Sequence, residues 1–96
     1  MARGDVASAA RWYDNQRAGL GDEFLYRVQE AMSRIEHSPQ AYAVVFEGLR
    51  RVGLRQFPYN LFFKILPDNS LVIACLHGKR SPLLARERAS DIGPTN

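Results

Sequence analysis

The sequence predicts an α+β domain in which a helical hairpin packs on a small antiparallel β-sheet. In the first half of the chain, apolar residues recur at the three- and four-residue spacing of amphipathic helices. From Arg50 onward the pattern changes to alternation and short apolar runs, which are typical of strands. Helices that precede a run of consecutive strands indicate an α+β fold with the helices gathered on one face of the sheet.

The first helix is expected to begin at Asp5, because aspartate is a favoured N-cap residue. One apolar face follows at positions i, i+3, i+4 and i+7, formed by Val6, Ala9, Ala10 and Tyr13. A helix with such a face must bury it against another element. We expect the next helix along the chain to be that element.

The second helix is expected to follow a turn at Gly19-Leu20-Gly21. Asp22 and Glu23 open it and suit the positive end of the helix dipole. Its apolar positions at helical spacing are Phe24, Leu25, Val28, Met32 and Ile35. The helix is expected to end at His37, since the residue before Pro39 is pushed out of the helical region. The two helices then form an antiparallel hairpin with one shared apolar seam.

Three strands in an antiparallel meander are predicted at Arg50–Phe57, Leu61–Leu66 and Leu71–Leu76. In the first strand, Arg51 and Arg55 are expected on one face, about 13 Å apart at the usual rise per residue. In the second strand, one face is expected to carry Leu61, Phe63 and Ile65. Ser81-Pro82 predicts a short last helix that runs to about Arg88.

Length and composition indicate one ordered domain. The chain has 96 residues, 46% hydrophobic and 24% charged, which predicts a single domain over 1–96 with its core at about 5–88. No apolar run approaches the length of a membrane span and the N-terminus lacks the apolar segment of a secretory signal, so we expect a cytoplasmic protein. One cysteine, Cys75, and two distant histidines, His37 and His77, predict no disulfide, no metal site and no cofactor.

Positive charge is concentrated in the second half of the chain. Residues 1–47 carry five basic against seven acidic residues, whereas residues 48–96 carry eight basic against three acidic ones. Arginine predominates among the basic residues, and its planar guanidinium binds carboxylates and phosphates in a bidentate manner. A basic half on a small domain indicates an acidic protein or a nucleic acid as partner.

Several short segments occur in an order that resembles a known family. They are Ala10-Arg11-Trp12-Tyr13, Gly19-Leu20-Gly21-Asp22-Glu23-Phe24, Ser38-Pro39, Arg50-Arg51, Arg55-Gln56-Phe57-Pro58-Tyr59 and Ala74-Cys75-Leu76-His77-Gly78-Lys79-Arg80. Over about residues 5–88, this set resembles the RelE/ParE superfamily of type II toxin–antitoxin toxins, above all the ParE-like members, also called plasmid stabilisation proteins. The resemblance implies a helical hairpin on a small antiparallel sheet.

The resemblance also implies a toxin that a cognate antitoxin neutralises and that acts by binding and inhibiting DNA gyrase. Gyrase inhibition within the family tends to depend on C-terminal basic residues, which here are Lys79, Arg80, Arg86 and Arg88. Family members usually begin with a β-strand, and only four residues precede Asp5 in this chain. A missing strand would leave one sheet edge unpaired, so we expect a homodimer or a sheet completed by the antitoxin.

An alternative from the same resemblance is a ribosome-dependent mRNA endoribonuclease of the RelE type. Such nucleases typically carry an arginine directly after the tyrosine that opens the second strand, and often a tyrosine near the C-terminus. This chain has Asn60 at the first position and no tyrosine after Tyr59. Catalysis would instead use the set His77, Lys79 and Arg80, with Glu47 as a candidate base. An inactive family member is the third hypothesis.

Further side chains are candidates for contact with the antitoxin or the target: Trp12, Arg50, Arg51 and Arg55. The alternative for the arginines is a solvated strand face or ion pairs with Glu23, Glu30 or Glu36. The alternatives for Trp12 are packing within the hairpin and stacking on a nucleic-acid base. Cys75 is expected to be a buried, inert core residue with a raised pKa.

Overall fold

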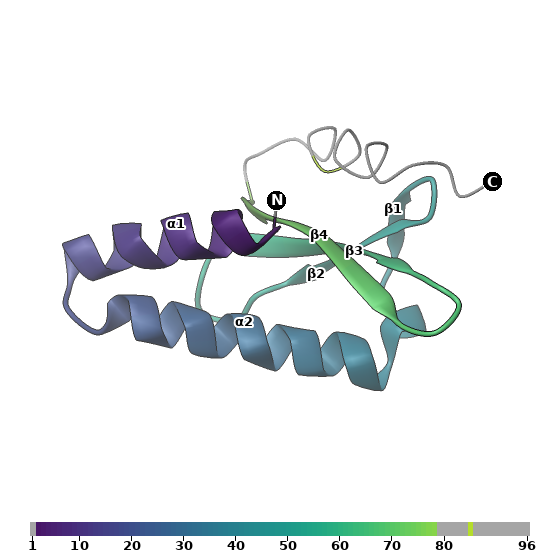
Figure 1. Ribbon diagram of the computed structural model, residues 1–96, viewed down its shortest axis with the longest axis horizontal. Coiled ribbons are helices and arrows are strands. Elements are labelled where there is room, and N and C mark those ends of the chain that lie inside the picture. The colour runs from purple at the N-terminus through teal and green to yellow at the C-terminus, as the bar shows by residue number, and fades with distance from the viewer. Residues whose placement is uncertain (1, 79–84, 86–96) are drawn as a thin grey trace.

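The computed structural model describes residues 2–78 and Ala85, which form two helices followed by a four-stranded sheet (Figure 1). Helices α1 (Ala2–Gln16) and α2 (Leu20–His37) lie side by side as an antiparallel hairpin. The chain reverses at Gly19, whose φ of +88° lies in the left-handed region that glycine adopts without strain. Neither described helix has the length and hydropathy that a membrane crossing needs.

The sheet contains β1 (Val44–Phe46), β2 (Leu49–Gly53), β3 (Tyr59–Ile65) and β4 (Ser70–His77). The strands lie in the order β1-β2-β3-β4, and each is antiparallel to its neighbour. A short 3-10 helix, η1 (Pro39–Ala41), connects α2 to the sheet. The α+β class and an antiparallel sheet after the helices are therefore confirmed, but the described sheet has four strands and not the three that the sequence predicts.

Two apolar clusters lie on opposite faces of the sheet. The cluster on the helix side joins Phe24, Val28 and Ile35 of α2 to Leu61 and Phe63 of β3, with Ile65 packed against it, as the alternation predicts. The cluster on the other face consists of Leu49, Phe62, Ile73, Ala74, Leu76 and Ala85. Because β3 is buried on both faces, its sequence is nearly all apolar instead of alternating.

Asp5 has a different role from the one the sequence predicts. α1 begins at Ala2, so Asp5 lies inside the helix and is not its N-cap. Its carboxylate accepts a hydrogen bond from the backbone N–H of Cys75 at 3.0 Å and so ties α1 to β4. The predicted N-cap is therefore wrong, and the side chain joins two elements that are 70 residues apart in the sequence.

The first predicted strand is also different in the structure. β2 ends at Gly53 and not at Phe57; residues 54–58 form the loop to β3, in which Gln56 has a φ of +74° that lies outside the extended region of a strand. The sequence analysis does not predict β1, which is only three residues long and pairs with β2 through a turn at Glu47 and Gly48. The predicted helix from Ser81 to about Arg88 lies outside the described residues apart from Ala85.

β4 is an edge strand of the described sheet, and no strand precedes α1 within residues 2–78. Asp5 occupies the N–H of Cys75 on this edge. Phe62 pairs with Ala74 and Phe63 with Val72, which leaves Ile73 as an extra residue in a β-bulge. Caps and bulges limit the pairing of edge strands, so the part of this edge best suited to pairing is the short stretch before Ile73.

Candidate functional site

One groove brings together two side chains that the sequence analysis singles out, Trp12 and His77. It has a volume of about 670 Å³ and lies between α1 and the ends of β3 and β4. α1 contributes Asp5, Ser8 and Trp12, which share a helix face because they are spaced by three and four residues. The strands contribute Tyr59 and His77, so we call this site the aromatic groove.

The aromatic groove is hollow because α1 has small residues between its larger ones. Gly4, Ser8 and Ala9 line it and leave space between Asp5 and Trp12. The Trp12 side chain is 56% exposed and meets the ring of Tyr13 edge-on, with 5.1 Å between ring centroids. Trp12 therefore lies mostly outside the hairpin core, and an exposed tryptophan at a groove is well suited to contact a partner.

The rings beneath Trp12 belong to the core. Tyr13 stacks on Phe24 at 5.4 Å and meets Phe57 edge-on at 4.8 Å. Burial raises the pKa of Tyr13, and the neighbouring Tyr59 raises it further. The hydroxyl group of Tyr13, which lines the groove, therefore stays protonated in ordinary buffers.

His77 lies at the end of β4, directly opposite Tyr59, with 5.3 Å between the two ring centroids. The basic residues that would accompany it in either active mechanism, Lys79, Arg80, Arg86 and Arg88, lie outside the described residues. Among the described residues, no group of three or more His, Cys, Asp and Glu side chains lies close enough to hold a metal ion.

Glu47 cannot serve as the base beside His77. It lies in the turn between β1 and β2, next to the pairing of Leu49 with Lys64, whereas His77 pairs with Tyr59 at the other end of β3. The stretch of β3 between Tyr59 and Lys64 spans about 17 Å at the usual rise per residue. A base and an acid must both reach the reacting atoms within hydrogen-bond distance, so this pairing is wrong.

The three candidate arginines lie in different surroundings. Arg50 is half-buried on the helix side, where its Nη1 donates to the Tyr42 carbonyl oxygen at 2.6 Å. Arg51 is exposed on the other face, opposite Phe62, and its side chain forms no hydrogen bond or ion pair with the described residues. Arg55 lies beyond β2 and pairs with Glu30 of α2 at 3.1 Å. The expectation that Arg51 and Arg55 share a face is wrong because β2 ends between them.

Arg55 belongs to a polar cluster that joins α2 to the loop between β2 and β3. Glu30 also accepts from Arg27 at 3.1 Å, and Gln56 accepts from Arg27 and donates to Glu23. The hydrogen bond from Gln56, together with that from Arg17, lowers the pKa of Glu23. For Glu30, desolvation acts to raise the pKa, but the hydrogen bond from Arg27 and the charge of Arg55 outweigh it. Both carboxylates therefore stay ionised; Glu23 accepts directly from the Gln56 side chain, and Glu30 holds Arg27, which donates to Gln56.

We expect Arg50 and Arg51 to differ sharply on replacement by alanine. Arg50→Ala should cost about 1–2 kcal/mol of unfolding free energy, because it removes a charged donor from a carbonyl of the segment that leads into β1. Arg51→Ala should change stability by less than about 0.5 kcal/mol, as exposed substitutions do, and weaken only partner binding. Urea denaturation of both variants measures this difference, and equal losses would contradict the assignment.

A second groove, the apolar groove, has a volume of about 860 Å³ and is lined by α1, α2 and β4. α2 contributes Leu25, Val28 and Met32 to it, and β4 contributes Val72 and Ile73. Leu25 and Met32 are 38% and 45% exposed, although their spacing predicts that they belong to the apolar seam of the hairpin. The apolar stripe of α2 is wider than α1 can cover. The number of apolar positions around α2 is therefore the feature of the sequence that indicates this groove.

Comparison of the chain with protein-family models, with curated proteins and with solved structures finds no match. The assignment of function therefore depends on the two grooves, the exposed arginine and the motifs in the sequence.

Cys75 lies beneath the aromatic groove, and its thiol is expected to be unreactive. Burial, with a further contribution from the charge of Asp5, raises the pKa of Cys75 from 9.0 to about 12. A raised pKa means that the unfolded chain loses the proton first, so stability should fall as the pH rises from about 9 to about 12. Labelling with a disulfide reagent at pH 8 should be slow in the native protein and fast in denaturant; fast native labelling would contradict the burial.

Proposed function

We propose that this chain is the toxin of a type II toxin–antitoxin pair of the RelE/ParE superfamily, that a cognate antitoxin neutralises it, and that the free toxin acts in the cytoplasm by binding and inhibiting DNA gyrase. The observation that carries the proposal is the apolar groove. A folded domain that keeps Leu25 and Met32 exposed beside a groove presents a surface that an amphipathic segment of an antitoxin can bury.

Two features favour binding over RNA cleavage as the mode of action. Asn60 stands where the resemblance places an arginine in the nucleases, and in the structure it lies in β3 opposite Gly53 and Leu76. Glu47 and His77 are at opposite ends of β3, so they cannot act together as base and acid on one RNA phosphate. Arg51 remains an exposed cation without a described partner and is suited to contact an acidic surface.

Ribosome-dependent RNA cleavage is the second candidate, and the aromatic groove favours it. Trp12 offers an exposed ring for stacking on a base, and His77 lies in the same groove two residues before Lys79. Histidine titrates near neutrality and can move a proton in such a reaction.

The two functions are separated by assays on the purified chain. Inhibition of supercoiling by purified gyrase, without cleavage of messenger RNA on ribosomes, supports the proposal, whereas cleavage alone supports the second candidate. Arg80→Ala should abolish growth arrest under either mechanism without unfolding the protein. If the wild type causes no growth arrest, the proposed function is contradicted. If Arg80→Ala still arrests growth, the role of Arg80 is contradicted.

Self-association through the edge of β4 is part of the proposal, and light scattering of the isolated chain tests it. The edge before Ile73 is available for pairing in the described part of the chain, so a homodimer is expected. A monomer at all concentrations would leave completion of the sheet to the antitoxin alone.

A further inference from the structure

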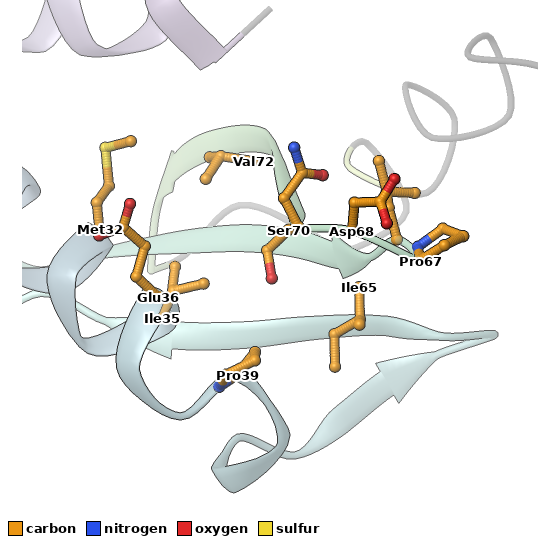
Figure 2. Close-up of a pocket in the computed structure, with 11 residues that line it drawn as sticks. Met32, Ile35, Glu36, Pro39, Ile65, Pro67, Asp68, Ser70 and Val72 are labelled. Carbon is orange, nitrogen blue, oxygen red and sulfur yellow. The ribbon is translucent and has the colours of Figure 1, made fainter.

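We infer that the apolar groove ends in an acidic pocket that selects a lysine or arginine side chain on the docked segment of the partner. The inference rests on the proposed function and adds to it the charge order of the segment that binds. The acidic pocket lies between the last turns of α2 and the turn that joins β3 to β4, and has a volume of about 590 Å³ (Figure 2).

The acidic pocket and the apolar groove are adjacent. Met32, Ser70 and Val72 line both cavities, so a segment docked in one lies next to the other. The acidic pocket is lined on its apolar side by Ile35 and Ile65. A docked segment can therefore bury apolar side chains along α2 and continue toward the turn between β3 and β4.

Charge distinguishes the two ends of this surface. Among the described residues, Glu36 and Asp68 are the charged side chains that line the acidic pocket, and Figure 2 shows Glu36 on the α2 side and Asp68 on the side of the turn. Both side chains are exposed, and neither forms a hydrogen bond or ion pair with another described side chain. In the apolar groove, the charged side chain of the described lining has the opposite sign and belongs to Arg3 of α1.

This arrangement specifies the chemistry of the occupant. Lysine and arginine have apolar stems and charged heads, so such a side chain can lie along Met32 and Ile35 while its cation enters a cavity whose charged lining is acidic. Near Arg3 the same segment should carry an acidic residue. The occupant is therefore an amphipathic segment of a second protein with an acidic residue toward α1 and a basic residue toward the turn between β3 and β4.

The test uses synthetic amphipathic helical peptides with a leucine face, identical except for lysine, glutamine or glutamate at one end. One series carries this residue at the N-terminal end and a second series carries it at the C-terminal end, so that either direction of the bound helix is tested. Fluorescence anisotropy with the full chain should give affinities in the order Lys, Gln, Glu, with about two- to fivefold between steps, the size expected for exposed charge pairs. Met32→Gln should weaken all three peptides, because it removes an apolar contact without adding a charge, and this result places them in the groove.

The charge-reversed variant Glu36→Lys/Asp68→Lys should invert the order and prefer the glutamate peptide. The matched control Asp22→Lys/Glu47→Lys has the same net charge but changes acids outside both cavities, and it should keep the wild-type order. Equal affinities for the three peptides, the absence of binding, or inversion in the control would overturn the inference. None of these results bears on the gyrase and ribosome assays of the free chain, so a failure here is distinguishable from a failure of the proposed function.

Discussion

Phe24→Ala is expected to lower the free energy of unfolding by about 3–5 kcal/mol, the usual cost of deleting a buried phenylalanine ring. The Phe24 side chain is fully buried where α2 meets the sheet. Its ring stacks on Tyr13 and meets Phe57 and Tyr59 edge-on at 5.2 and 5.1 Å. These four rings join α1, α2, β3 and the loop before it, so the cavity left by alanine cannot close by the movement of one element.

Domains of this size are stabilised by about 5–15 kcal/mol, so Phe24→Ala should leave a visible unfolded fraction at moderate temperature. The neighbouring substitution Leu25→Ala is the matched control, because Leu25 lies on the apolar groove and is partly exposed. It should cost less than about 1 kcal/mol and instead weaken the binding of a docked segment. Urea and thermal denaturation give both values; similar losses for the two variants would show that the core does not depend on Phe24.

The sequence predicts those elements that depend on local periodicity. The hairpin of α1 and α2, the strands β3 and β4 and the shared face of Leu61 and Phe63 follow from spacing alone. β1 could not be predicted in this way, because three residues are too few to show a period. The loop after β2 holds Gln56 with a positive φ, and the Gln56 side chain is hydrogen-bonded to Arg27 and Glu23 of α2; contacts between segments so far apart in the sequence follow from no local rule.

The candidate sites show the same limit. His77 and Trp12 are recognisable in the sequence as unusual residues, but only the packing of α1 on β4 brings them into one groove. Asp5 has the side chain of an N-cap residue, but its carboxylate accepts a hydrogen bond from the backbone N–H of Cys75 in β4. The acidic pocket is not visible in the sequence, since Glu36 lies in the last turn of α2 and Asp68 lies in the turn between β3 and β4, and only the fold places both on one cavity.

Gly21→Ala is expected to destabilise the protein by about 2 kcal/mol, although alanine favours helices. A Cβ atom at position 21 would lie 2.5 Å from the carbonyl oxygen of Ala10 and 2.7 Å from the carboxyl group of Asp14. The Gly21 N–H also donates to Asp14 Oδ1 at 2.7 Å. The backbone of α2 at Gly21 is therefore packed directly against α1. Overpacking of this kind costs about 1–3 kcal/mol, and the upper part of that range applies because the nearest obstacle is backbone.

Alanine in place of glycine gains at most about 1 kcal/mol of helix propensity. The steric clash at position 21 costs more than this, so the net effect of Gly21→Ala should be destabilising. Gly4→Ala isolates the propensity term, because Gly4 lies in α1 and a Cβ there meets no atom within 4 Å. We therefore expect Gly4→Ala to stabilise the protein by up to about 1 kcal/mol while Gly21→Ala destabilises it. Thermal denaturation of the two variants provides the comparison. A stabilising effect of alanine at both positions would mean that the helices are separated at this point and that the hairpin does not have the close packing on which both grooves depend.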